Sequence, residues 1–99
     1  MAQMSSFMDE FSKHDPEFGE LVNTIRAKAR ETGALDQKTK TLITLALGAA
    51  GGHSEGVKAR AAEARSLGAS KEELAETIRL TFLVSGIPGL VAGMTAFQE

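Results

Sequence analysis

Hydrophobic and polar positions along the chain recur with a helical period. The clearest example is a set of apolar residues spaced by three or four positions, namely Phe18, Leu21, Val22, Ile25 and Ala29. This spacing places side chains on one face of an α-helix. No segment between turn signals alternates apolar and polar residues with the period of two that is typical of a β-strand. The pattern therefore predicts an all-α fold.

Residues that begin and end helices divide the chain into about six helical segments. Asp15 and Asp36 are expected to cap two helices, and the run Ser70 to Glu73 has the spacing of a capping box. Gly33 and Gly68 stand where a left-handed residue commonly ends a helix. The predicted helices span residues 5–13, 16–31, 37–50, 54–67, 71–85 and 88–97.

Two of these segments are too apolar for a small monomer. Thr41 to Ser54 and Leu80 to Gln98 contain no formal charge, and a helix that is hydrophobic all round must be buried on all sides. A chain of 99 residues forms one domain, over residues 1–99, with few places to surround two such helices. We therefore expect an obligate homo-oligomer. The alternative is that one of the two helices occupies the centre of an ordinary helical bundle.

Composition and charge narrow the classes of function. The chain has no cysteine and a formal net charge of −2, which gives no electrostatic footprint for nucleic acid. The N-terminus lacks the pattern of a signal peptide, so a cytoplasmic location is expected. The segment Leu80 to Gln98 is short for a membrane span and is interrupted by glycine and proline, so no membrane association is expected. His14 and His53 have no metal-ligand spacing, and we expect no metal and no cofactor.

His53 and Arg60 are the residues best suited to chemistry. His53 follows two glycines at the expected start of a helix, and histidine is the side chain best suited to proton transfer near neutral pH. Arg60 lies seven residues further on, which is about 700° of helical rotation and places it near the same face. A guanidinium there could hold the carboxylate of a small organic acid by two hydrogen bonds.

Structural explanations for the same residues remain open. His53 could lie with its ring in water at the entry to the helix, and Arg60 could pair with Glu63 or Glu55. Ser54 has no motif that would make it a nucleophile, and we expect it to be the helix cap.

Three stretches of sequence resemble the carboxymuconolactone decarboxylase family, which includes the alkyl hydroperoxidase D-like proteins. They are Leu35 to Leu47, Ala64 to Glu76 and Gly86 to Val91. The similar region covers about residues 35–97, with the N-terminal helices of about residues 5–31 in front of it. The resemblance implies an alkyl hydroperoxidase D-like helical fold assembled as a trimer or hexamer, which agrees with the oligomer expected from the apolar segments.

The resemblance also locates four positions that differ from the redox branch of the family. That branch has a Glu, a Cys-x-x-Cys pair and a His, and the matching positions here hold Thr41, His53, Gly56 and Arg60. A disulfide mechanism needs a thiolate to attack and another to resolve, so a thiol peroxidase is disfavoured. The decarboxylase branch lacks the Cys pair but has a His at the position of Arg60.

Two classes of function follow. The first is a non-redox oligomeric protein that binds a small molecule or has a structural role. The alternative is a cofactor-free decarboxylase or lactone-type enzyme for a small organic acid. In that enzyme His53 would be the acid or base, Arg60 the carboxylate anchor, and Thr41 and Gly56 residues that line the pocket. The sequence does not decide whether the chain is an enzyme.

Overall fold

The computed structural model describes the backbone of residues 2–98 and the side chains of residues 7–98. This part of the chain contains helices and no strand, which confirms the all-α prediction. The elements are α1 (Ala2–His14), α2 (Pro16–Ala29), α3 (Gln37–Ala50), α4 (Ser54–Ser66), α5 (Lys71–Gly93) and a short 3-10 helix, η1 (Met94–Phe97).

The predicted N-terminal caps are confirmed. The Asp15 side chain accepts a hydrogen bond from the Phe18 amide at 3.2 Å, and the Asp36 side chain accepts one from the Thr39 amide at 2.8 Å. Ser70 begins α5 with a complete capping box. These side chains satisfy amides that have no partner within their own helix.

Predictions for other helix ends had mixed outcomes. Gly68 has a φ of 94° and ends α4 in the left-handed region, as predicted. The prediction for Gly33 was wrong, because α2 ends earlier at Arg30 and Gly33 does not have a positive φ. Ser54 is also not a cap, since it is the first residue of α4 and the cap position belongs to His53.

The two predicted C-terminal helices form one bent element. Gly86, inside α5, has a φ of 71° and a ψ of −154°, a conformation open to glycine and strained for other residues. Pro88 follows in the first turn after this break, where a proline needs no amide hydrogen bond. The chain turns back at Gly86 and then tightens into η1 beyond Gly93.

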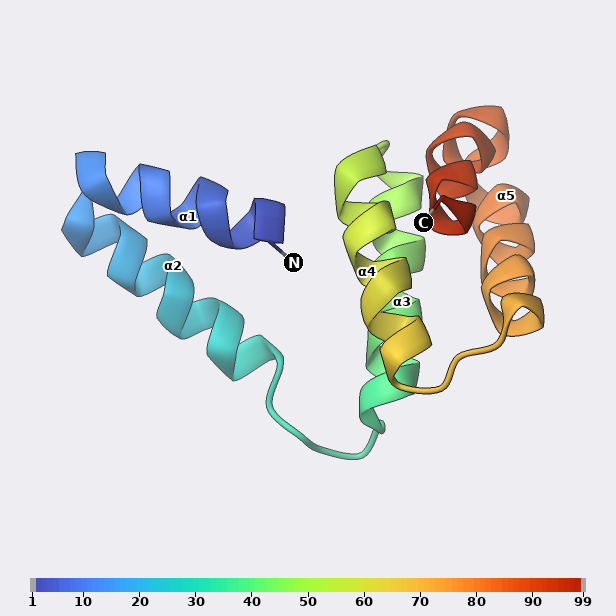
Figure 1. Ribbon diagram of the computed structural model, residues 1–99, viewed down its shortest axis with the longest axis horizontal. Coiled ribbons are helices and arrows are strands. Elements are labelled where there is room, and N and C mark those ends of the chain that lie inside the picture. The colour runs from blue at the N-terminus through green and yellow to red at the C-terminus, as the bar shows by residue number, and fades with distance from the viewer. Residues whose placement is uncertain (1, 99) are drawn as a thin grey trace.

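The helices α3, α4 and α5 with η1 form the packed part of the molecule (Figure 1). Helix α3 lies between α4 and α5, and the bend in α5 returns η1 to α4. Helices α1 and α2 form a hairpin that extends to one side, connected to α3 by a loop over residues 30–36 (Figure 1). Through its first helix this hairpin contacts α4.

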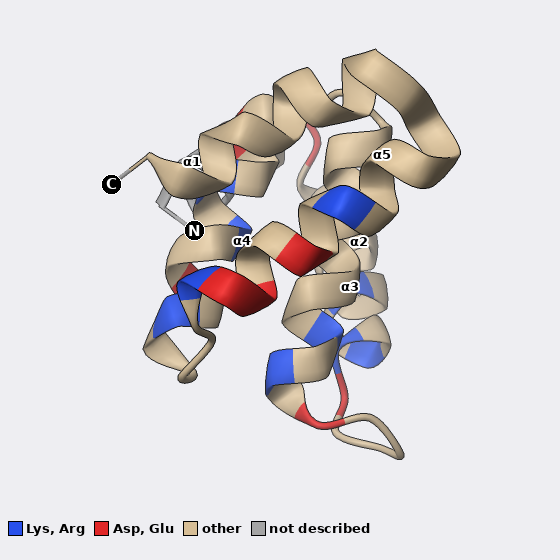
Figure 2. Ribbon diagram, turned by 90° about the vertical axis from the view of Figure 1, so that its right-hand side faces the viewer, with Lys and Arg blue, Asp and Glu red and all other residues tan. Residues whose placement is uncertain are grey.

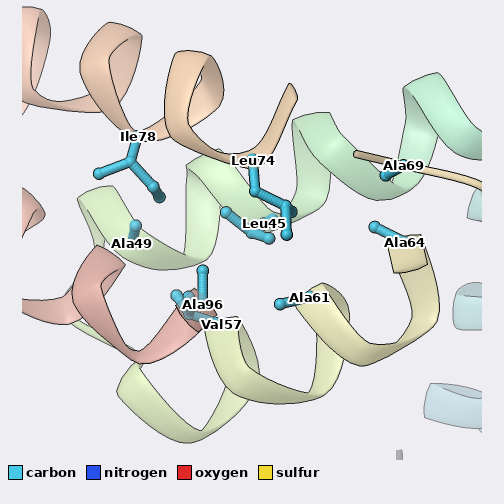
Figure 3. Close-up of a cluster of buried hydrophobic side chains, with 9 residues drawn as sticks. All are labelled: Leu45, Ala49, Val57, Ala61, Ala64, Ala69, Leu74, Ile78 and Ala96. Carbon is cyan, nitrogen blue, oxygen red and sulfur yellow. The ribbon is translucent and has the colours of Figure 1, made fainter. Parts of the chain in front are cut away.

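The core is built largely from small side chains (Figure 3). Leu45, Val57 and Leu74 are its largest fully buried side chains, one from each of the three main helices. The other members of the cluster are Ala49, Ala61, Ala64, Ala69, Ile78 and Ala96. Alanine allows helix axes to approach closely, so the core is thin and the helices enclose little apolar volume.

Polar contacts fix the ends of these helices. The Lys38 ammonium lies 3.0 Å from a Glu73 carboxylate oxygen and joins the start of α3 to the start of α5. An Arg65 guanidinium nitrogen donates to the Ala96 carbonyl at 2.8 Å and holds η1 against α4. The pKa of Glu73 is lowered, first by its hydrogen bond from the Ser70 amide and then by Lys38.

Much apolar surface remains uncovered. The predicted apolar stripe of α2 is largely exposed to solvent, with more than half of the surface of Phe18, Leu21 and Ile25 accessible. The pattern thus predicted the helix correctly, but its apolar face is not buried within this chain. Leu83 and Val84 in α5 are 77% and 86% exposed. From Leu80 to Gln98 the ribbon carries no charged residue (Figure 2).

One apolar run in the described residues, Lys71–Phe97, is long and apolar enough to cross a membrane by length and composition. Its backbone breaks at Gly86 and tightens into η1. Core helices of soluble proteins meet the same criterion, so the run does not indicate a membrane span.

The conformation of Gly86 leads to a stability prediction. Replacing Gly86 by Ala should lower the free energy of unfolding by about 1–3 kcal/mol, because a Cβ is strained at this φ and ψ. Gly33→Ala is the matched control, since Gly33 does not have a positive φ and a Cβ there meets nothing within 4 Å. Urea unfolding followed by circular dichroism measures both variants. Equal stability of the two would contradict the strained bend.

The lowered pKa of Glu73 leads to a pH prediction. A carboxylate with a folded pKa below its unfolded value of about 4.3 stabilises the fold above that pH, and the contribution is lost as the pH falls through the folded pKa. Glu73→Gln should therefore lower stability at pH 7 and flatten its decline in acid. Glu72→Gln removes the same charge from the same helical turn and should change that decline less. Thermal unfolding between pH 3 and 7 measures both, and identical acid profiles would refute the prediction.

Candidate functional site

The turn between α3 and α4 positions the candidate site. Helix α3 ends at Gly51, and Gly52 adopts a φ of 78°, which reverses the chain towards α4. The His53 amide donates to the Gly48 carbonyl at 2.9 Å, and the His53 carbonyl accepts from the Val57 amide at the same distance. The backbone of His53 is thus hydrogen-bonded to both helices.

The imidazole of His53 folds back over Gly51. A Cβ built on Gly51 would lie 2.8 and 2.9 Å from ring atoms Cδ2 and Nε2, so the ring occupies space that a side chain at residue 51 would need. His53 is exposed, and within the described part of the chain its side chain does not cap α4. The ring is therefore accessible and is positioned by contact with the backbone.

Arg60 is buried, with 7% of its surface exposed. Its Nε lies 3.0 Å from a carboxylate oxygen of Glu63, one of the pairings that the sequence left open. Burial lowers the pKa of Arg60, Glu63 acts in the opposite direction, and the positive charges of Arg30 and Arg26 lower the pKa further. The guanidinium therefore lies in surroundings that disfavour its charge, and one neighbouring carboxylate partly compensates for them.

A large cavity of about 580 Å³ lies at the turn between α3 and α4. Its lining residues are Thr44, Gly48, His53, Ser54, Glu55, Gly56 and Arg60. The structure therefore places three of the four candidate site residues, His53, Gly56 and Arg60, at one cavity. A Cβ built on Gly56 would lie 3.7 Å from the His53 Cβ, an ordinary contact, so the bare Gly56 leaves this part of the cavity open.

Thr41 lies at a second, small cavity of about 60 Å³. This cavity is lined by Ala29, Arg30, Gln37, Lys40, Thr41, Thr44, Arg60 and Glu63. Thr44 and Arg60 line both cavities, so the two cavities adjoin at these residues. The four positions that match the redox residues of the resembled family thus lie at two adjoining cavities, with Thr41 on the far side of Arg60 from His53 and Gly56.

Sequence reasoning missed several lining residues. Thr44 and Gly48 lie three and seven positions after Thr41, so the helical period could have placed them on the same face of α3. Arg30 gave no such signal, because it reaches the small cavity through the path of the loop after α2. Among the described residues, no group of three or more His, Asp or Glu side chains could hold a metal ion.

Comparisons with known proteins agree with this architecture. The model of the carboxymuconolactone decarboxylase family matches residues 16–99. An uncharacterized protein of Methanocaldococcus jannaschii is 28% identical over 87 residues, which is 88% of this chain and 81% of that protein. The crystal structure of a carboxymuconolactone decarboxylase family protein from Legionella pneumophila, in its apo form, matches with a TM-score of 0.83. Its sequence identity is 29%, over 96% of this chain and 85% of that one.

The family match begins at residue 16 and so includes α2, whereas the resemblance was expected from Leu35 onwards. The fold, the order of the helices and the matched residues all lead to one conclusion. This chain belongs to the carboxymuconolactone decarboxylase family.

Proposed function

We propose that this chain is a non-redox member of its family that binds a small organic acid and acts as a homo-oligomer of three or six copies. The observation that carries the binding role is the buried guanidinium of Arg60 on the wall of the large cavity. A buried charge is costly unless opposite charge compensates for it. Glu63 is one such group, while Arg30 and Arg26 add positive charge. A bound carboxylate would improve this balance.

Three residues that line the large cavity have roles in this proposal. Arg60 anchors the carboxylate, and the missing side chain of Gly56 leaves room for the body of the ligand. The exposed imidazole of His53 lies at the same cavity and can accept or donate a hydrogen bond. His53 and Gly56 replace the two thiols, so this site has no thiolate for peroxide chemistry.

The second candidate function is a cofactor-free decarboxylase or lactone-type enzyme. The observation that favours it is the accessible imidazole of His53 beside the cavity that Arg60 lines, where it could exchange a proton with a bound acid. Catalytic histidines are commonly oriented by a further hydrogen-bonded group. In this enzyme that group would come from the ligand or from a neighbouring copy.

The homo-oligomer is supported by uncovered apolar surface. Among the side chains of residues 7–98, fifteen large hydrophobic ones are exposed, far beyond single scattered residues. In addition, an apolar cavity of about 410 Å³ lies where α5 folds back, with Phe82, Leu90 and Phe97 among its lining residues. Burial of this surface against identical copies would remove it from water.

A binding experiment tests the acid site. Calorimetric titration of the purified protein with benzoate should detect binding, and the neutral analogue benzamide should bind about tenfold more weakly, because it lacks the charge that pairs with Arg60. The double variant Arg60→Gln/Glu63→Gln removes the buried ion pair as a unit and should abolish the preference. Lys58→Gln, an exposed change on the same helix, is the control and should preserve it.

Several outcomes distinguish the candidate functions. Benzoate and other small carboxylic acids that fail to bind the wild-type protein would overturn the binding role and leave a structural one. Consumption of lactone or β-keto acid substrates that is lost in His53→Ala, with the oligomer intact, would establish the enzyme instead.

A second experiment tests the assembly. Native mass spectrometry of the wild-type protein should give three or six copies. Leu83→Glu should shift the population to smaller species, because the charge would enter a surface that assembly buries. Thr32→Glu adds the same charge in the loop before α3 and should leave the assembly unchanged. A monomeric wild-type protein would overturn the proposed oligomer.

A further inference from the structure

The small cavity on the far side of Arg60 differs in chemistry from the large one. Three cationic side chains line it, from Arg30, Lys40 and Arg60, and one carboxylate, from Glu63. They come from the end of α2, the first turns of α3 and the middle of α4. Segments that are separate in the sequence thus place an excess of positive charge around a space of about 60 Å³.

Among the residues that line this cavity, one carboxylate accompanies the three cations. Glu63 is paired with Arg60. The Lys40 ammonium donates hydrogen bonds to the backbone carbonyls of Arg30 and Glu31, which are neutral groups. Arg30 makes no ion pair within the described part of the chain. Three cations therefore face the cavity against one carboxylate, and a cavity of this kind attracts an anion.

The size of the cavity limits what can enter. One water molecule needs about 10–15 Å³ of such volume, so about 60 Å³ accommodates a planar group of three or four heavy atoms. A carboxylate has this size and shape. A guanidinium group such as that of Arg30 can meet it with two hydrogen bonds.

The geometry points to a carboxylate subsite in this small cavity. We propose that it receives the carboxylate of an organic acid whose uncharged body extends past Thr44 and Arg60, which line both cavities, into the large cavity. This inference rests on the proposed acid-binding function and extends it in two ways. It assigns the carboxylate to Arg30 and Lys40 as well as Arg60, and it selects acids with one carboxylate on a compact uncharged body.

Besides its charge, Lys40 contributes to the position of Arg30. Its two hydrogen bonds to the carbonyls of residues 30 and 31 hold the end of α2 beside α3. Because these bonds use the backbone of Arg30, replacing the Arg30 side chain leaves their acceptors in place. Arg30 can therefore be varied without removing the contact that positions the loop.

Nuclear magnetic resonance titrations with acetate and with benzoate test the subsite on the full chain. Acetate should shift the backbone amide resonances of Lys40 and Thr41 at the small cavity. Benzoate should shift the same resonances and also those of Gly48 and Gly56 near the large cavity. Arg30→Gln should weaken the binding of both anions about tenfold through loss of a charge-assisted pair of hydrogen bonds.

Two further variants control for charge and folding. Arg26→Gln removes an equal charge one helical turn earlier at a residue that does not line the cavity, and it should weaken binding less than twofold. Arg30→Lys restores the charge and should recover part of the lost affinity. Equal effects of Arg26→Gln and Arg30→Gln would overturn the subsite, because a general field would then explain the binding.

The remaining outcomes separate this inference from the proposed function. If benzoate binds Arg30→Gln as tightly as the wild-type protein and shifts resonances near Gly48 and Gly56 alone, the carboxylate lies in the large cavity. The subsite is then wrong and the proposed function stands. If acetate binds as tightly as benzoate, the large cavity does not hold the body of the ligand and the proposal fails. If neither anion binds the wild-type protein, both proposals fail.

Discussion

The burial of α3 is the constraint on which the rest of this structure depends. This helix has no charge after Lys40, and α4 and α5 cover two of its sides with a thin core of alanine and leucine. The remaining sides keep Ile43 44% exposed and Leu47 68% exposed. A single copy of the chain therefore leaves part of the apolar surface of α3 exposed to solvent. The apolar faces of α2 and α5 are exposed as well. The proposed homo-oligomer would cover all three surfaces.

The close packing of α3 against α4 also determines what the candidate site can contain. Gly52, with its φ of 78°, allows the chain to reverse tightly, and the ring of His53 occupies the space beside Gly51. Arg60 then enters from α4 at the boundary of two cavities, where its charge is largely removed from water. The site thus combines an accessible imidazole with a buried cation, which is suited to holding an acid more than to redox chemistry.

The helices could be predicted from the sequence because their signals are local. Asp15, Asp36 and Ser70 cap amides three residues away, and a period of 3.6 residues marks a helix whether or not its apolar face is covered. Whether that face is buried depends on surfaces that are distant in the sequence. The sequence therefore predicted the apolar stripe of α2 but not its exposure to solvent. Similarly, the helical period brought His53 and Arg60 together, but the path of the loop after α2 decided that Arg30 would approach Arg60.

The residues at the four positions that match the family's redox residues are compatible with one another in a site without thiols. Loss of the thiols alone would remove the redox chemistry and add nothing. Gly56 also enlarges the cavity. Arg60 places a permanent charge at the position where the family has a histidine, a residue that can lose its proton. Because Thr41 stands at the position of the family's Glu, no carboxylate comes from that position. Glu63, on the same helix as Arg60, forms the ion pair with it instead. A scaffold retained only for its shape would gain nothing from burying an arginine, because an apolar residue of similar size is generally less costly there. The burial of this charge beside two cavities therefore supports the proposal that the site binds an anion.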